Sequence, residues 1–478
     1  MTSTVVLGID SSTQSTKALA VDLKSGEIVG EGRALHTGRD IQDPQDWWVA
    51  LVSSVQQATP AGAEVAAISV GGQQHGMVAL DPANRVLVPA PLWNNVDAAP
   101  DAERLNSLAN FAQEVGVYLV ASITIAKLAH LARTDPDSLE LLDAVALPHD
   151  WLNLQLTGRL ATDRGEASGS GWWSPGSGRH RRDLLALAIG DEKAALIRLP
   201  EVVGPNEVVG RLTDAAAAAL GLPAGIPVGP GTGDNMAAAL GVGAMPGELV
   251  ISLGTSGTAF AVSDHPVADE RGEIEGFADA TGRFLPLTCM LNCTRVLDAM
   301  AGMVGLERDL ALERAGAAAP GADGVWLMPY LAGERLPNLP QATGSLFGLT
   351  MSNARPDSLV RAALDGVAAG LAYGVEALAE QGVTGQEVVL VGGGSQHPAW
   401  RQAVADATGL PVHVRGGREH AALGAAMQAI AVATGTPIDG VVSAHRPETV
   451  AVIEPRPEYR DAFRLTERRA LIEQARPA

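Results

Sequence analysis

The sequence predicts an α/β protein built from two domains, and three observations support this fold class. The chain has 478 residues, which is longer than a single hydrophobic core usually supports. Short runs of β-branched residues alternate with longer segments of helical periodicity, the pattern of strands layered against helices. Finally, a strand, turn, strand pattern rich in Gly, Ser and Thr occurs once in each half of the chain.

The first half of the chain opens with three predicted strands. They cover 4–10, 17–23 and 27–35, and a tight turn joins the last two. Segment 44–58 has the apolar spacing of a helix, and 65–73 returns to a strand pattern. A strand that follows a helix in this way indicates α/β layering.

The second half repeats the opening pattern. Segment 247–264 is a strand, a small-residue turn and a strand, and it matches 5–22 in length and character. Segment 387–409 is a further strand, a glycine turn and a helix. We therefore expect an N-terminal domain over 1–243 and a C-terminal domain over 244–478.

Charge and composition limit the class of partner. With 34 Lys and Arg against 54 Asp and Glu, the formal net charge is -20, which argues against nucleic acid or an anionic membrane as the main partner. No uninterrupted apolar run approaches the roughly 20 residues that cross a bilayer, and the N-terminus lacks the pattern of a signal peptide. Cys289 and Cys293 have no zinc-site spacing, so we expect reduced thiols and a cytoplasmic protein.

The two small-residue turns suggest phosphate binding. Consecutive backbone N–H groups with Ser or Thr hydroxyls form a nest for anions, so one turn in each domain predicts a clamp for a polyphosphate. Either turn alone is more often only a tight connection. The P-loop pattern and the G-x-G-x-x-G dinucleotide pattern are both missing, so any phosphate site uses another scheme.

Asp234 is a carboxylate isolated among small residues in "GPGTGDNMAAALGVG". One interpretation is an N-cap, because the residues that follow it have good helical character. The other is a catalytic role, in which the helix dipole keeps the carboxylate ionised and ready to accept a proton. The local sequence leaves both interpretations open.

Several motifs occur in one order along nearly the whole chain. They are "GIDSSTQSTKA", "GGQQHGMVALD" followed by "PLWNN", "GTGDNMAAALGVG", "SLGTSGT", "MPYLAGERLPNLPQATGSLFGLT" and "VGGGSQHPAWRQ". Together they resemble the FGGY carbohydrate kinases, and within that family the xylulose kinases most. The resemblance implies two ribonuclease-H-like, actin-like ATPase domains, with sugar and ATP bound in the cleft between them.

The resemblance also implies an activity and its catalytic residues. The expected reaction is ATP-dependent transfer of a phosphoryl group to the terminal hydroxyl of a ketopentose, D-xylulose first of all. Asp234 matches the general base, which accepts the hydroxyl proton. Asp10 matches the carboxylate near the γ-phosphate, and the two carboxylates together are the expected neighbours of Mg²⁺.

By the same resemblance, nucleotide contacts fall in both halves of the chain. The matching residues are Thr13, Gln14, Ser15, Lys17, Gly254, Thr255, Gly393 and Gly394. Gln14 departs from the hydroxyl residue that the pattern carries. For any single glycine, tight turn geometry is an equally good explanation.

The sugar contacts implied by the resemblance come from the N-terminal half and from the segment of the base. They are Gln73, Gln74, His75, Trp93, Asn94, Asp234 and Asn235. Two departures bear on the shape of this pocket. Asn95 stands where the family has Asp and the Arg that follows is missing, and Ala126 and His130 replace a Pro and a Trp.

Two alternatives remain open at this stage. A kinase for another ketose or polyol, such as ribulose, erythritol or a pentitol, fits the same motifs. A non-kinase actin-like ATPase retains both turns without needing Asp234 or the Gln and His segment, because fold alone does not fix function. For the assembly, a homodimer is the expected alternative to a monomer.

Overall fold

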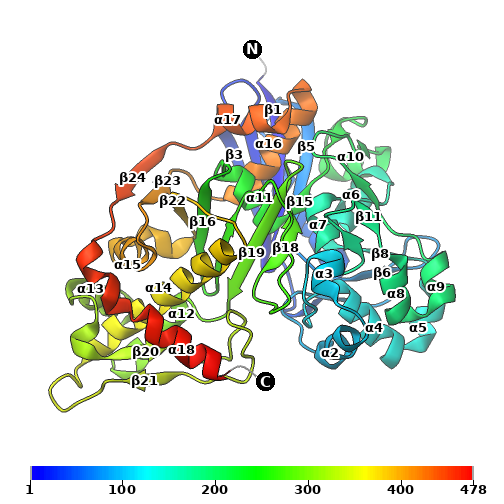
Figure 1. The fold of residues 1–478 in the computed structure, drawn as a ribbon. Coiled ribbons are helices and arrows are strands. Elements are labelled where there is room, and N and C mark those ends of the chain that lie inside the picture. Colours follow the sequence, from blue (N-terminus) through cyan, green and yellow to red (C-terminus); the bar gives the residue numbers. More distant parts are fainter. Residues whose placement is uncertain (1–2, 476–478) are drawn as a thin grey trace. The chain divides into compact units, whose positions relative to one another are not determined.

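Both small-residue turns lie inside seven-stranded sheets in the computed structural model, which describes residues 3–475. The contacts divide the chain into two units, and Figure 1 labels their elements. The first unit consists of Met1–Gly243, Gly276–Phe284 and Gly417–Pro447. The second consists of Ala244–Glu275, Leu285–Gly416 and Glu448–Ala478. The predicted α/β class is confirmed.

This arrangement differs from the expected division into 1–243 and 244–478. The chain returns twice to the first unit after leaving it, through 276–284 and 417–447. Both returning segments have ordinary helix and strand patterns. Such a pattern predicts the type of element but not the sheet against which the element packs. The chain first passes from one unit to the other at Gly243 and Ala244, where the boundary was expected, and then returns twice.

The sheet of the first unit contains the first predicted hairpin at its centre. Its order is β13-β14-β5-β1-β2-β3, and β15 also pairs with β5. The strands are β1 (Thr4–Ser11), β2 (Ser15–Asp22), β3 (Ile28–Leu35), β5 (Glu64–Gly72), β13 (Gly210–Arg211), β14 (Pro227–Val228) and β15 (Thr232–Gly233). The short pairs outside this sheet are β4 (Ile41–Gln42) with β7 (Ala90–Pro91), β6 (Val78–Leu80) with β8 (Ala144–Ala146), β9 (Ala161–Asp163) with β12 (Glu201–Val203), and β10 (Trp173–Ser174) with β11 (Arg179–His180).

The helices of the first unit come mostly from the N-terminal half of the chain. They are α1 (Pro44–Ala58), α2 (Ala99–Leu108), α3 (Phe111–Val115), α4 (Thr124–Thr134), α5 (Pro136–Leu141), α6 (Pro148–Thr157), α7 (Arg164–Ser168), α8 (Arg182–Ile189), α9 (Asp191–Leu196), α10 (Asp214–Leu220), α11 (Asp234–Gly241), α16 (His420–Thr434) and α17 (Ile438–His445). The predicted helix over 44–58 is confirmed by α1. Asp43 caps it by accepting a hydrogen bond from the Gln45 backbone N–H.

Side-chain alternation along β1 decides which way Asp10 points. Leu7 and Ile9 are buried in the core that β1 shares with α1. Gly8 lies on the other face, against α16, where a Cβ would come 2.2 Å from the backbone oxygen of Ala422. Because neighbouring residues of a strand face opposite sides, Asp10 points to the same side as Gly8. In Figure 1, α16 runs beside β1 although the two are far apart in sequence.

Helix α11 is held by a close glycine contact with α16. A Cβ on Gly241 would come 1.8 Å from the backbone oxygen of His420, and one on Gly424 would come 1.9 Å from that of Ala237. Only glycine permits backbones to approach this closely. The contact fixes the direction of α11 and hence the position of its first residue, Asp234.

The other seven-stranded sheet is built around the second predicted hairpin and belongs to the second unit, except for 276–278 of β18 and Phe284 of β19, which the contacts assign to the first unit. Its order is β18-β19-β17-β16-β22-β23-β24. The strands are β16 (Glu248–Leu253), β17 (Gly257–Ala261), β18 (Glu275–Ala278), β19 (Phe284–Met290), β22 (Glu387–Val391), β23 (Val412–Arg415) and β24 (Thr449–Ile453), with β20 (Trp326–Met328) and β21 (Ser345–Phe347) as a separate pair. The helices are α12 (Thr294–Met303), α13 (Arg308–Ala317), α14 (Pro356–Glu380), α15 (Pro398–Thr408) and α18 (Leu465–Ala475).

Helix α14 forms much of the core of the second unit. Its side chains pack with those of β16 and β22, and with Trp400 of α15. It is long and apolar enough to cross a bilayer, but 78% of its most apolar window is buried inside the protein. Its hydrophobicity is therefore that of a core helix.

Candidate functional site

Three strands of the first unit end side by side at the predicted catalytic residues. In parallel register, Asp10 of β1 and Thr232 of β15 both lie opposite Gly71 of β5. The residues that follow these strands therefore emerge at one edge of the sheet. They include the segment Gln73, Gln74 and His75 after β5, and Asp234 after β15. The structure thus brings together the expected base, the expected phosphate-side carboxylate and the expected sugar segment.

Asp234 is partly buried and is the first residue of α11. The N-cap is Gly233, so the capping interpretation of Asp234 is wrong. Its Oδ1 accepts a hydrogen bond of 3.0 Å from Nδ2 of Asn235. Burial, and then the charge of Asp10, raise the pKa of Asp234 to about 7. Burial and the charge of Asp10 therefore act against ionisation, which the position at the helix start would favour.

Asp10 is 4% exposed and lies at the end of β1. The Ser12 hydroxyl is 2.7 and 2.8 Å from its two carboxylate oxygens. Burial raises the pKa of Asp10, while the bond from Ser12 and the charge of Lys17 act against that rise. The two carboxylates thus share a region in which negative charge is poorly solvated, which is a setting that favours a bound cation.

The turn between β1 and β2 carries the expected phosphate contacts of the first unit. Thr13 Oγ1 accepts a hydrogen bond of 2.9 Å from the indole N–H of Trp93, so these two predicted site residues are in contact. Gln14 is exposed, and Ser15 is buried and accepts a bond of 3.3 Å from Nε of Arg33. Of the three, only Thr13 has its side chain tied to another predicted site residue.

Replacing Thr13 with Val is expected to raise the KM for ATP by about tenfold, the usual cost of a lost hydrogen bond to a charged group, with a smaller change in the KM for sugar. Steady-state kinetics with each substrate varied in turn measures both values. Trp93→Phe is the control, because it removes only the bond that Trp93 donates to Thr13. If the control raises the ATP KM equally, the hydroxyl acts through Trp93 and the phosphate contact is wrong.

Lys17 lies opposite Asp10 in the register of β1 and β2, so it faces the same side of the sheet. Its Nζ donates a hydrogen bond to Glu419 Oε2. Glu419 precedes α16 and has a φ of 56°, a left-handed conformation that is uncommon outside glycine. Glu419 therefore holds the ammonium group that the sequence assigns to ATP.

Lys17→Met is expected to raise the KM for ATP by roughly 3- to 10-fold, because one ammonium contact to phosphate is lost. Glu419→Gln is the matched variant, since it releases Lys17 from its ion pair and leaves the ammonium in place. We expect this second variant to keep the ATP KM at or below the wild-type value. Equal increases in both variants would mean that Lys17 serves only the ion pair.

The sugar segment after β5 is buried and holds unpaired polar atoms. Gln73 is fully buried, and neither its Nε2 nor its Oε1 has a hydrogen-bond partner among the described residues. Gln74 accepts a bond of 2.9 Å from Nδ2 of Asn235, whereas its own Nε2 lacks a partner within the same residues. Buried amides without partners are costly unless a ligand completes them, so this segment suits a polyhydroxylated substrate.

His75 is held in an unusual conformation at this edge. Its φ is 64°, its ring stacks at a tilt on Phe277 with 5.4 Å between centroids, and Nδ1 is 3.2 Å from the backbone oxygen of Gly169. The ammonium of the buried Lys127 donates to the His75 carbonyl oxygen at 3.0 Å. A strained residue with this many supports is typical of a functional site.

The "WNN" segment contains one buried residue and one exposed residue. Asn94, an expected sugar contact, is exposed. Asn95 is buried and its Nδ2 lies 3.1 Å from Oδ2 of Asp40 and 3.1 Å from Oδ2 of Asp97. Asn95, which stands where the family pattern has Asp, therefore has two acidic neighbours. Its amide can donate hydrogen bonds to them, whereas a carboxylate cannot.

The nucleotide residues of the second unit also meet at one sheet edge. Strands β16 and β22 are parallel, with Ser252 opposite Val391, so the turns that follow them are adjacent. A Cβ on Gly394 would contact Leu253 at 3.0 Å, whereas Gly393 has nothing within 4 Å of that point. Thr255 is exposed on its turn. The open space at Gly393 suits close approach of a planar ligand to the backbone.

Several buried polar residues near Asp234 were missed from the sequence. They are His149, Asp150, Asp163 and Glu166, together with Lys127. His149 and Asp150 are at a helix start and Asp163 ends a short strand, where charged residues are ordinary, and no pattern in the sequence indicates that these residues, Glu166 or Lys127 are buried. Their function is considered below.

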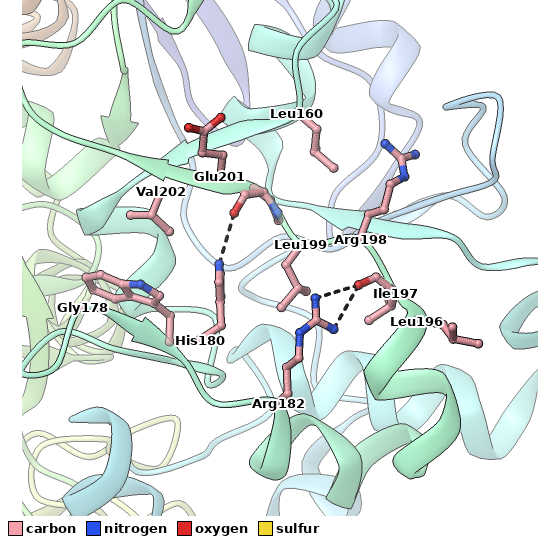
Figure 2. A pocket seen from close by; sticks show the side chains of 12 residues that line it. Leu160, Gly178, His180, Arg182, Leu196, Ile197, Arg198, Leu199, Glu201 and Val202 are labelled. Atoms are coloured by element: carbon pink, nitrogen blue, oxygen red, sulfur yellow. Dashed lines mark hydrogen bonds between the residues drawn. The ribbon is translucent and has the colours of Figure 1, made fainter.

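A separate cavity of about 730 Å³ lies in the first unit, and Figure 2 shows its lining. His180 Nε2 lies 3.2 Å from the backbone oxygen of Pro200, and Arg182 donates to that of Ile197 at 3.1 and 3.2 Å. None of the predicted catalytic or binding residues lines this cavity. This cavity is therefore separate from the predicted site.

Comparisons with known proteins are consistent across the chain. The N-terminal domain model of the FGGY family of carbohydrate kinases matches residues 5–241, and the C-terminal domain model of the same family matches 249–433. The xylulose kinase of Streptomyces coelicolor is 43% identical over 459 residues, covering 94% of this chain and 91% of that protein. The xylulose kinase of Escherichia coli is 34% identical over 433 residues and covers 88% of each. The crystal structure of the xylulose kinase from Bifidobacterium adolescentis has a TM-score of 0.88 and 34% identity, covering 97% of this chain and 99% of that one.

Proposed function

Because this chain belongs to the FGGY family of carbohydrate kinases, we propose that its substrate is D-xylulose, which it converts to D-xylulose 5-phosphate with ATP. The identity of 43% to a xylulose kinase over 94% of the chain supports this choice of sugar. The observation in the structure that carries the proposal is the meeting of Asp10, Asp234 and the Gln73 to His75 segment at the ends of three adjacent strands.

In this proposal Asp234 accepts the proton of the attacking sugar hydroxyl. Its pKa of about 7 is appropriate for a general base. A carboxylate with a pKa near the working pH is partly ionised and is also basic enough to accept a proton. Asn235 holds one carboxylate oxygen through its bond to Oδ1, which leaves Oδ2 for the hydroxyl. The unpaired amides of Gln73 and Gln74 orient the sugar through its other hydroxyl groups.

We assign Mg²⁺ to the region of Asp10 and Asp234. The fit rests on their oxygen donors, and on the raised pKa of Asp234, which reflects burial and the nearby charge of Asp10. Within residues 3–475 no group of three or more His, Cys, Asp or Glu side chains is arranged to hold a metal. That suits an ion bound by one or two carboxylates, water and the phosphates of ATP. When bound, the ion neutralises charge on the transferring phosphoryl group.

The nucleotide residues come from both units in this proposal. The turn with Thr13 in the first unit and the turns with Thr255 and Gly393 in the second are the proposed contacts of the ATP molecule. We also propose a cytoplasmic location, which the two free cysteines support, since burial raises the pKa of Cys293 to about 12 and keeps it unreactive. A homodimer remains the proposed assembly, to be checked by light scattering.

A coupled assay of ADP release tests the function. Wild-type protein with ATP and Mg²⁺ is given D-xylulose, D-ribulose, erythritol and pentitols in separate reactions, and a reaction without acceptor is the control. We expect D-xylulose to give the largest kcat/KM. A larger value with another acceptor would change the assigned sugar. ADP release that no acceptor increases would contradict kinase activity and favour the ATPase alternative.

A further inference from the structure

A group of buried polar side chains near Asp234 has no role in the proposed reaction. His149 and Asp150 begin α6, Asp163 ends β9, and Glu166 lies in α7. Their exposures are 0%, 0%, 4% and 0% respectively. Burying several ionisable groups costs folding free energy. A set of such groups near a proposed base therefore indicates a functional role.

Glu166 is fixed against the strand that leads into Asp234. Asp163 caps α7, since its carboxylate accepts bonds of 2.8 Å from the Gly165 N–H and 2.9 Å from the Glu166 N–H. The same carboxylate accepts a bond of 2.7 Å from the hydroxyl of Thr232, in β15. The Asp163 side chain therefore links α7 to β15, and Asp234 directly follows β15.

The Glu166 carboxyl faces Gln74 across Gly233. A Cβ on Gly233 would come 2.5 Å from Glu166 Oε1 and 2.6 Å from Cγ of Gln74, so both side chains lie against the space that Gly233 leaves open. Among the described residues, neither carboxyl oxygen of Glu166 has a partner with hydrogen-bond geometry, and Nε2 of Gln74 has none either. An amide donor and a carboxyl acceptor thus lie beside one another with no competing partner.

From Gln74 the contacts continue to the base. Asn235 Nδ2 donates to Gln74 Oε1 at 2.9 Å and to Asp234 Oδ1 at 3.0 Å. One amide group therefore joins Gln74 to the catalytic carboxylate. Hydrogen bonds thus connect Gln74 through Asn235 to Asp234, and the Glu166 carboxyl lies next to the Gln74 end of this series across Gly233.

The surroundings of Glu166 disfavour its negative charge. Burial, and then the neighbouring Asp150, Asp163 and Asp234, raise the pKa of Glu166 well above its usual value, while the Gln74 amide acts in the opposite direction. His149 Nδ1 lies 3.9 Å from Glu166 Oε2, but burial lowers the pKa of His149 to about 3, so it supplies no positive charge. These surroundings favour the neutral form of the Glu166 carboxyl, which can both donate and accept hydrogen bonds.

We propose that Glu166 is a positioning residue for the phosphoryl transfer: it holds the Gln74 amide, and through Asn235 it sets the orientation of the Asp234 carboxylate. This inference rests on the proposed role of Asp234. Because Glu166 does not touch the reacting atoms, its effect falls on the alignment of the base. The binding of ATP is not expected to depend on it.

The test compares Glu166→Leu with Glu166→Gln. The first removes both hydrogen-bonding atoms at similar volume, and we expect it to lower kcat by about 10- to 100-fold, the usual cost of a misaligned base, with the ATP KM within about twofold of wild type. The second keeps a neutral group that bonds to Gln74, and we expect it to retain at least about a third of wild-type kcat. Circular dichroism melting establishes that each variant is folded.

A double-mutant cycle separates positioning from a general loss of structure. In an Asn235→Ala background the link to Asp234 is already cut, so adding Glu166→Leu should lower kcat by less than about twofold more. If Glu166→Leu does not fold, Glu166→Gln and Asn235→Ala still decide the question, the first expected active and the second expected to lower kcat by about tenfold or more.

Three results would overturn the inference: a folded Glu166→Leu enzyme with wild-type kcat, a Glu166→Gln enzyme as impaired as the Leu variant, or additive losses in the cycle. Every variant is compared with wild type on whichever acceptor the wild type uses fastest. A wrong sugar assignment therefore changes the acceptor and leaves these ratios intact, so failure of the proposed substrate is distinguishable from failure of the positioning role.

Discussion

Asp234→Asn is expected to lower kcat by a factor on the order of 10² to 10⁴, the usual contribution of a general base, with a much smaller change in the KM for sugar. Asn has nearly the same shape as Asp, so the pocket and the bond from Asn235 to position 234 are largely preserved. What is lost is the ability to accept a proton. Steady-state kinetics on the preferred acceptor measures the effect.

Asp214→Asn is the matched control for this change. Asp214 is also the first residue of a short helix, α10, whose N-cap is Thr213, but it is exposed. We expect wild-type kcat from the control, because an exposed carboxylate at a helix start contributes only a small dipole interaction. Turnover above about a tenth of wild type in Asp234→Asn would contradict the role of base, since that loss is too small for general-base catalysis.

The pH dependence of kcat/KM is the second large effect. Only the ionised form of Asp234 accepts a proton, and its pKa is raised to about 7. Activity is therefore expected to be full above this pKa and to be lost as the pH falls through it. Well below the midpoint kcat/KM decreases about tenfold per pH unit. Half of the base is already protonated at pH 7, so kcat/KM falls roughly 50-fold between pH 7 and pH 5.

Replacing Asp10 tests whether the pH profile of kcat/KM reports the ionisation of Asp234. The charge of Asp10 is the second cause of the raised pKa, after burial, so Asp10→Asn should move the midpoint of the residual activity to lower pH. In Asp234→Asn, the residual kcat/KM should no longer fall as the pH decreases through about 7, because the titrating carboxyl group is absent. A wild-type midpoint near pH 4, the ordinary range of a carboxyl group, would mean that Asp234 is well solvated and would contradict the burial on which the assignment depends.

Local pattern accounted for most of the secondary structure at the site. The strands at 4–10 and 17–23, the helix at 44–58 and the hairpin at 247–264 are present in the structure with boundaries within a few residues of those expected. These segments share a clear apolar periodicity, bounded by small residues. The motif resemblance then supplied the family, which the comparisons confirm.

The environment of the site could not be predicted in the same way. The sequence left Asp234 as either a cap or a base, and the structure shows that Gly233 has the cap position. It gave no sign that Glu166 and His149 are buried, because burial depends on which distant segments pack around a residue. The partner of Lys17 was missed for the same reason, since Glu419 lies 402 residues further along the chain.

The late return of α16 to the first unit has a consequence for synthesis on the ribosome. Strands β1 and β5 emerge early, yet the helix that covers one of their faces ends only at Thr434. Until that segment has left the exit tunnel, the face around Gly8 has no native cover, and the first unit cannot complete its fold. Contacts this distant in sequence slow folding and leave apolar surface exposed meanwhile. The fold of the first unit is therefore completed only after residues 420–434 have been synthesised.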